Sequence, residues 1–153
     1  MDEVIIRPAR PEELGAAAEL RWRWEQERHG TPAVPRAEYL PLFTAWARAN
    51  DSSHRCLVAV RGGAVIGMAW LAIVPRVPVP RAPERRTADL QSVYVVPEER
   101  DSGIGGRLIE AVLALARDLG AERATVHSSQ RAIPAYTRHG FAVSPRLLQA
   151  DLG

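Results

Sequence analysis

Three glycines fall within four positions at the start of a helix-like segment, residues 103–119, which follows a strand-like segment, residues 88–96. A glycine inside a helix costs about 1 kcal/mol relative to alanine, so a glycine-rich helix start needs a reason. The first amides of a helix have no partner within it and carry partial positive charge, and glycine lets an anion approach them closely. The stretch RDSGIGGRL (100–108) therefore predicts a strand–loop–helix unit that binds a phosphate or pyrophosphate. The glycines concerned are Gly103, Gly105 and Gly106.

Three known kinds of phosphate loop can be compared with this stretch. The P-loop requires a lysine, whereas all twenty basic residues here are arginine. The dinucleotide fingerprint G-x-G-x-x-G fits Gly103 and Gly105 but has Leu108 at its third position. The third pattern, R-x-x-G-x-G, matches from Arg100 to Gly105. A tight strand-to-helix turn without a ligand is the simpler alternative, but such a turn usually needs one glycine.

The composition limits the remaining classes of protein. At 153 residues the chain fits one domain, 1–153, and its 46% hydrophobic residues supply a core. A formal charge of +2 is too small for a protein that coats nucleic acid. The acidic N-terminal stretch does not resemble a signal peptide, and no segment approaches the roughly 20 apolar residues of a membrane span. Cys56 is the only cysteine, so no internal disulfide can form, and we expect a cytoplasmic protein that binds neither membrane nor nucleic acid.

The periodicity along the chain predicts an α/β (α+β) protein with a mixed sheet. A short strand at 4–8 precedes two helices, 11–30 and 36–50, the second with a break expected at Pro41. A hairpin at 56–74 and a Pro/Arg-rich loop at 75–87 lead to the strand–loop–helix unit. Further elements are expected as a strand at 122–127, a short helix at 131–140, and closing strands at 141–145 and 147–152.

Two longer segments resemble the GNAT acetyltransferases. LQSVYVVPEERDSGIGGRLIEAVLALARDLG (90–120) is similar to that family's motif A, and AIPAYTRHGF (132–141) is similar to its later tyrosine-containing segment. The resemblance implies a mixed, mostly antiparallel sheet of six or seven strands, flanked by about four helices, with splayed parallel central strands. It also implies direct transfer of an acetyl group from acetyl-CoA to a primary amine of a small molecule or peptide.

The resemblance also implies which residues hold acetyl-CoA. The pyrophosphate would lie on the loop amides, the pantetheine arm would pair with the strand before the loop as an added strand, and Arg107 could donate from its side chain as well. A carboxylate repels a pyrophosphate, so the side chain of Asp101 is expected to point to solvent. Ser129 stands where many members have an asparagine that bonds the pantetheine. The implied cofactor-binding residues are Val93, Tyr94, Val95, Val96, Arg100, Asp101, Ser102, Gly103, Ile104, Gly105, Gly106, Arg107, Ser129 and Tyr136.

Three residues are implied in the chemistry, and no metal is expected. Tyr136 matches the tyrosine that protonates the leaving CoA thiolate, which suits a phenol that is neutral at physiological pH. Asp89 and His127 are alternative general bases for the acceptor amine, Asp89 acting through a bridging water, although many family members use no dedicated base. Each has a structural alternative: a packing tyrosine, a solvated strand-end acid and a core histidine.

The acceptor side and the assembly are less constrained. Trp22 and Trp24 cannot share a helix face, so at least one is expected to line a groove or an interface. The arginines of loop 75–87 form either a lid suited to an acidic acceptor or a solvated loop, and a homodimer is also considered. Two further functions stay open: a non-catalytic acyl-CoA sensor of the same fold, and an unrelated nucleotide-binding α/β module.

Overall fold

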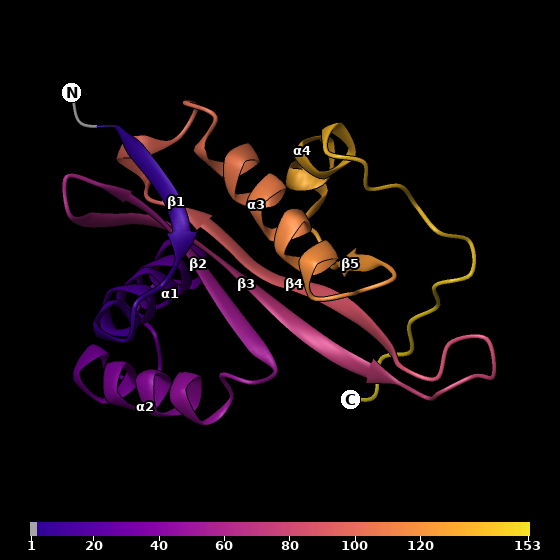
Figure 1. Ribbon diagram of the computed structural model, residues 1–153. Coiled ribbons are helices and arrows are strands. Elements are labelled where there is room, and N and C mark those ends of the chain that lie inside the picture. Colours follow the sequence, from indigo (N-terminus) through magenta and orange to yellow (C-terminus); the bar gives the residue numbers. More distant parts are fainter. Residues whose placement is uncertain (1–2) are drawn as a thin grey trace.

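The structure is a computed structural model that describes residues 3–153, and it is built on one five-stranded sheet of order β1-β2-β3-β4-β5 (Figure 1). Strands β1 to β4 pair antiparallel, whereas β4 and β5 pair parallel. Helices α1 and α2 lie on one face of the sheet, and α3 and α4 lie on the other (Figure 1). The strands are β1 (Val4–Pro8), β2 (His54–Arg61), β3 (Ala64–Arg76), β4 (Arg85–Val95) and β5 (Ala124–Val126). The helices are α1 (Leu14–His29), α2 (Arg36–Ala49), α3 (Ile104–Asp118) and α4 (Ile133–Arg138), with 3-10 turns η1 (Pro11–Glu13), η2 (Pro97–Glu99) and η3 (Gln130–Ala132).

Helix α3 is the main support of the sheet on its face. Its residues Ile104, Leu108, Val112 and Ala116 recur every four positions and are all buried, so they form the apolar stripe that a helix needs to pack on a sheet. Leu108 lies close to Gly67 of β3, where an added Cβ would come within 3.2 Å of the leucine. This packing fixes where α3 begins, and therefore where the glycine-rich loop sits.

Helix α2 continues through Pro41 without the break expected there. Pro41 removes one backbone donor and is exposed, so the carbonyl that loses its helical partner can bind water instead. The helix is also held from the sheet side, because Phe43 and Trp46 pack against Trp70 of β3 at ring separations of 5.5 and 5.8 Å.

The loop expected at 75–87 is shorter than the sequence suggested. Strand pairing continues through Pro75 with Arg86 and through Arg76 with Arg85, which leaves residues 77–84 as the connection. The amide of Ile73 bonds Ser53 just before β2, so by the alternation of a strand the nitrogen of Pro75 faces the side where β2 has already ended. The proline therefore removes no hydrogen bond that the sheet could have made.

The two closing strands expected at 141–145 and 147–152 do not form, and the sheet has five strands instead of six or seven. Residues 141–153 run as an irregular segment along the β5 side of the molecule (Figure 1). Pro145 supplies no amide to a ladder, and adjacent leucines at 147 and 148 would point to opposite faces of a strand. Four large apolar side chains are left 63–97% exposed: Val143, Leu147, Leu148 and Leu152.

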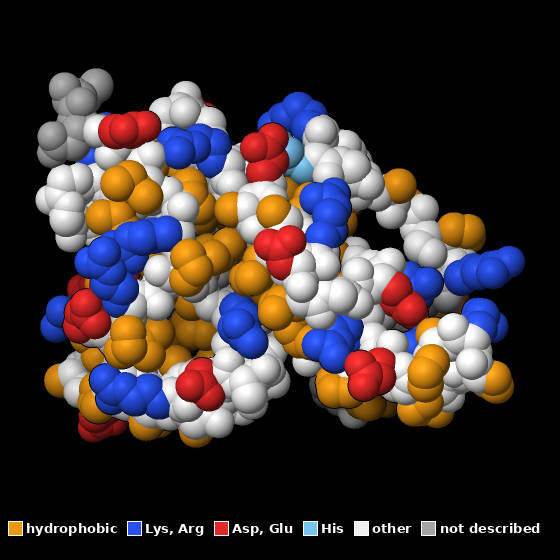
Figure 2. All heavy atoms as spheres, viewed as in Figure 1, with side chains coloured by type: hydrophobic (Ala, Val, Ile, Leu, Met, Phe, Trp, Pro, Cys, Tyr) orange, Lys and Arg blue, Asp and Glu red, His pale blue; other side chains and the backbone are white. Residues whose placement is uncertain are grey.

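Charged side chains are mixed over the face seen in Figure 2, with arginines and acidic residues alternating across it. Of the helices in residues 3–153, none is both long and apolar enough to cross a membrane.

Candidate active site

Strands β4 and β5 part from one another after only three residue pairs, from Ala88 with Ala124 to Leu90 with Val126. At the same point β4 carries a bulge, because Leu71 of β3 pairs with Leu90 whereas the preceding Trp70 pairs with Ser92. Gln91 is thereby the extra residue, and a bulge bends its strand and increases its twist. The rest of β4 therefore has an open edge on the side away from β3.

Two residues of β4 direct their backbone groups to this open edge. The amide of Val96 bonds the carbonyl of Ile66 on the β3 side at 2.9 Å. Because bonding direction alternates along a strand, Tyr94 also faces β3, whereas Val93 and Val95 face the open edge. The side chain of Arg100 agrees, since its Nε donates to the Val95 carbonyl from that edge at 2.8 Å. Of the four strand residues implied in cofactor binding, Val93 and Val95 thus offer backbone groups to an extended ligand.

The glycine-rich loop closes one end of this edge and forms a cavity of about 290 Å³. The first intrahelical bond of α3 runs from the amide of Arg107 to the carbonyl of Gly103 at 3.1 Å. The amides of Ile104, Gly105 and Gly106 precede it and have no partner inside the helix. The cavity is lined by Val93, Val95, Glu99, Arg100, Asp101, Gly103, Ile104 and Gly105.

The three glycines have different structural reasons. Gly103 has a φ of 84°, in the left-handed region that caps the start of α3. A Cβ on Gly105 would meet nothing within 4 Å, so this position opens into the cavity. A Cβ on Gly106 would lie 2.9 Å from Nε2 of His139, so Gly106 allows the residue after α4 to approach α3. Only Gly103 and Gly105 line the cavity.

Asp101 is the one non-glycine residue with positive φ in the described chain, at 64°. Aspartate and asparagine tolerate this left-handed conformation better than other residues. The residue is exposed, as expected. Left-handed residues in a turn expose successive amides toward one concavity, which is a common way to hold an anion.

Arg100 and Arg107 use their side chains inside the protein. Arg100 donates to Glu27 of α1 at 3.0 Å and lies over the ring of Tyr94, and the Tyr94 hydroxyl donates to the same carboxylate. Burial raises the pKa of Tyr94 to about 12, and the bond to Glu27 adds to the shift. Burial opposes ionisation of Glu27, yet the hydrogen bonds from Tyr94 and Arg100 leave its pKa below the ordinary value. This cluster ties α1 to the start of the loop, and no local sequence pattern indicates the role of Glu27.

The side chain of Arg107 is bonded within the protein. Its Nη2 donates to the carbonyl of Val4 in β1 at 2.9 Å. The guanidinium therefore links α3 to the first strand.

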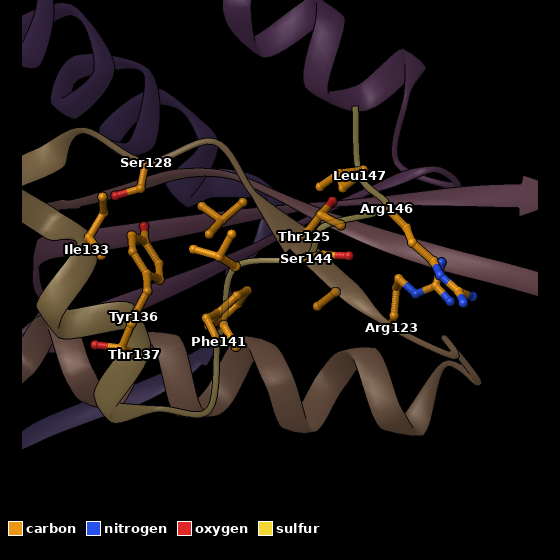
Figure 3. A pocket seen from close by; sticks show the side chains of 14 residues that line it. Arg123, Thr125, Ser128, Ile133, Tyr136, Thr137, Phe141, Ser144, Arg146 and Leu147 are labelled. Carbon is orange, nitrogen blue, oxygen red and sulfur yellow. The ribbon is translucent and has the colours of Figure 1, made fainter. Parts of the chain in front are cut away.

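Tyr136 lies in a second, larger cavity of about 600 Å³ between β5, α4 and residues 141–147 (Figure 3). Its ring packs edge-on against Phe141 at 5.3 Å, and its hydroxyl points toward Ser128 (Figure 3). Burial raises the pKa of the Tyr136 phenol, so the hydroxyl stays protonated at neutral pH. Ser128 lines this cavity, whereas Ser129 precedes η3 and is exposed, its carbonyl accepting from the Ser128 hydroxyl at 2.7 Å.

Asp89 is held at the point where the strands part. Its carboxylate accepts from Thr125 of β5 at 2.9 Å and from the side-chain amide of Gln91 at 3.1 Å. Sequence reasoning missed both donors, because the bulge at Gln91 and the pairing with Thr125 depend on strand register. His127 follows β5 and is exposed, and within residues 3–153 its ring makes no hydrogen bond. Of these two candidate bases, only Asp89 is held by hydrogen bonds within the described residues.

The side opposite the glycine loop has a cavity of about 280 Å³ between α1 and the start of α2. Trp22 lines it and donates from its indole to the Val34 carbonyl at 3.0 Å, whereas Trp24 stacks on Tyr94 at 5.5 Å. The expectation that one of the two tryptophans lines a groove is therefore confirmed. In the loop suggested as a cationic lid, Arg85 is paired with Glu122 at 2.7 Å.

Known proteins resemble this chain in sequence. The model of the acetyltransferase (GNAT) family matches residues 16–141. Among curated proteins, a glucosamine 6-phosphate N-acetyltransferase of Trypanosoma brucei brucei is 29% identical over 90 residues, which are 59% of this chain and 59% of that protein. The chain thus matches about three-fifths of that relative's length.

Solved structures share the fold. An acetyltransferase of Trypanosoma brucei superposes with a TM-score of 0.74 at 24% identity, covering 98% of this chain and 100% of the other. A predicted acetyltransferase of Clostridium acetobutylicum, solved with acetyl-CoA, gives 0.80 at 16% identity, covering 97% and 96%. At these identities the likeness extends to the arrangement of strands and helices.

Proposed function

The chain belongs to the acetyltransferase (GNAT) family, and we propose that it moves an acetyl group from acetyl-CoA directly to a primary amine of a small molecule or peptide. The observation that carries the proposal is the open edge of β4. It runs from the glycine-rich cavity to the point where β4 and β5 part, and Tyr136 and Asp89 lie on elements beside that point. Holding donor and acceptor together at one place supplies much of the rate in such a transfer.

The residues fit acetyl-CoA in two respects. The amides at the start of α3, together with Gly103 and Gly105, suit the pyrophosphate. The outward-facing backbone groups of Val93 and Val95 suit the peptide-like pantetheine arm, which would be added like a strand. When bound, acetyl-CoA supplies an activated thioester at the point where the strands part.

The chain's own groups would then manage the protons. Asp89, fixed by Thr125 and Gln91, accepts the proton of the acceptor amine through a water. Tyr136, kept protonated by burial, donates its hydroxyl proton to the thiolate that leaves. The Val93 amide, directed to the open edge, stabilises the carbonyl oxygen.

The first experiment measures acetyl-CoA binding and CoA release for wild type and Tyr136→Phe. Acetyl-CoA at 100 times its Kd should stabilise the fold by about 2.7 kcal/mol in both proteins. The phenylalanine variant should lose about 100-fold in kcat while its KM for acetyl-CoA stays within about twofold. Arg28→Gln, an exposed change on α1, serves as the control for activity.

Each failure has a distinct meaning. An unchanged kcat in Tyr136→Phe removes Tyr136 from the mechanism. Stabilisation by acetyl-CoA without turnover across amine classes would assign the chain to acyl-CoA sensing. Stabilisation by ATP or NAD but not by CoA would favour a nucleotide-binding module.

The name of the curated relative suggests a first acceptor to test, glucosamine 6-phosphate.

We also propose that residues 1–153 act as one domain and that the enzyme works in the cytoplasm. A single cysteine fits a reducing compartment, and burial raises the pKa of the Cys56 thiol to about 12, which keeps it unreactive. Finally, we propose a homodimer, for which the exposed Leu148 and Leu152 provide a surface.

A further inference from the structure

The cavity that contains Tyr136 carries charge of one sign. Fourteen residues line it, and the only charged ones are Arg123 and Arg146. The rest are apolar or carry hydroxyl groups. A cavity with two cations and no lining carboxylate repels a polyamine and attracts an anion.

The two arginines come from different parts of the chain to one end of the cavity. Arg123 immediately precedes β5, and Arg146 lies in the irregular C-terminal segment. Figure 3 shows both side chains at the end of the cavity remote from Tyr136 and Ser128. Two guanidinium groups at one place can hold a phosphate or carboxylate through several charge-assisted hydrogen bonds.

No acidic side chain is bonded to either guanidinium among the described residues, and Glu122 attracts Arg123 only at longer range. Within residues 3–153 neither guanidinium forms an ion pair or side-chain hydrogen bond. Glu122, next to Arg123 in sequence, is paired with Arg85 at 2.7 Å. The positive charge at the end of the cavity is therefore available to a ligand.

The opposite end of the cavity is where acetyl transfer is proposed. Tyr136 and Ser128 lie there, whereas Thr125, which donates to Asp89 at 2.9 Å, lines the cavity nearer the arginines (Figure 3). Between the ends the wall is apolar, with Val126, Ile133 and Phe141. Because a strand rises about 3.3 Å per residue, Arg123 and Val126 are roughly 10 Å apart along β5.

We propose that this cavity binds the acceptor, and that the acceptor is a small amine with an anionic group at its far end. The amino group lies toward Tyr136, and a phosphate or carboxylate lies between Arg123 and Arg146. The inference rests on the proposed acetyl transfer and adds the substrate class, together with two residues that determine it.

Matched pairs of amines test this. One arm compares aminobutyl phosphate with aminobutanol, and the other compares aminohexanoate with its amide, so that phosphate and carboxylate are distinguished. The anionic member of at least one pair should have a kcat/KM at least tenfold higher. Arg123→Gln and Arg146→Gln should each lower kcat/KM for the anionic member about tenfold. The kcat/KM for the neutral member should stay within twofold of wild type. Arg28→Gln, exposed on α1, should change neither value.

A second readout guards against misfolding and absent turnover. Arg123→Lys and Arg146→Lys keep the charge and should recover part of the affinity for the anionic probe, measured by calorimetry with CoA present. Equal kcat/KM for charged and neutral amines would overturn the inference while leaving acetyl transfer intact. If no amine is acetylated, the proposed acetyl transfer is wrong. In that case, equal binding of both members of each pair overturns the anionic site as well.

Discussion

At the scale of single residues, Asp101 combines a strained backbone with an unfavourable charge. Its φ of 64° costs an L-residue about 1 kcal/mol, and its carboxylate lies on the loop proposed to bind a pyrophosphate. Asp101→Gly should raise the free energy of unfolding by up to about 1 kcal/mol and lower the KM for acetyl-CoA about threefold. Chemical denaturation and initial-rate kinetics measure the two effects.

Asp101→Asn separates conformation from charge. Asparagine tolerates the left-handed region about as well as aspartate, so stability should stay unchanged while KM still falls. The effect on KM should shrink at high salt, because exposed charges are screened. A KM that rises in both variants would mean that the carboxylate assists binding.

Gly105 should show opposite effects on stability and on binding. A Cβ there meets no atom within 4 Å, so Gly105→Ala should gain up to about 1 kcal/mol of stability from helix propensity. The same methyl group enters the cavity beside the helix amides, so the KM for acetyl-CoA should rise at least tenfold. Tighter binding in this variant would place the anion elsewhere.

At the scale of elements, one ion pair holds β1 to the start of α1. Arg7 donates two hydrogen bonds to Glu13, at 2.7 and 2.8 Å, and the amide of Arg10 adds a third. Chiefly through the bond from Arg7, the pKa of Glu13 falls from about 4.5 to about 2. A lowered pKa means that the folded state binds this proton less readily than the unfolded state does.

The resulting stabilisation is present above pH 4.5 and is lost as pH falls toward 2. Glu13→Gln should therefore have a shallower fall in unfolding free energy across that window, by the equivalent of one proton at most. Glu12→Gln changes an exposed neighbour that makes no hydrogen bond in the described chain, and it should keep the wild-type slope. Parallel curves for all three proteins would remove the ion pair as the cause.

Elements with strong local signals were predictable from the sequence, and those that depend on pairing were not. The spacing of Leu108 and Val112 and the glycines before them indicate α3 and its loop from local chemistry alone. The bulge at Gln91 and the donors that hold Asp89 arise from register between distant strands, which no local pattern encodes. Gly106 was interpreted only as part of the anion cradle. Its close approach to His139 was not predictable, because the two residues are far apart in sequence.

At the scale of the whole molecule, the C-terminal segment was expected to close the sheet but does not. Its apolar residues had the composition of strands, whereas the backbone from 141 to 153 is irregular and β5 stays at the sheet edge. The apolar composition of residues 141–153 therefore indicated that these side chains pack against something, but it did not indicate which surface covers them. Within one chain these contacts are missing for Leu148 and Leu152, which are 87% and 97% exposed.

A second copy of the chain would cover these side chains, because the same exposed apolar patch on each chain can form a two-fold interface. Light scattering after size exclusion should then give twice the chain mass, and Leu148→Ser with Leu152→Ser should give the single mass. Val77→Ser alters an equally exposed apolar residue in the β3–β4 loop, 80% exposed, and should leave the dimer intact. A single-chain mass for the wild type at every concentration would contradict the dimer, and these leucines would then face solvent in the working enzyme.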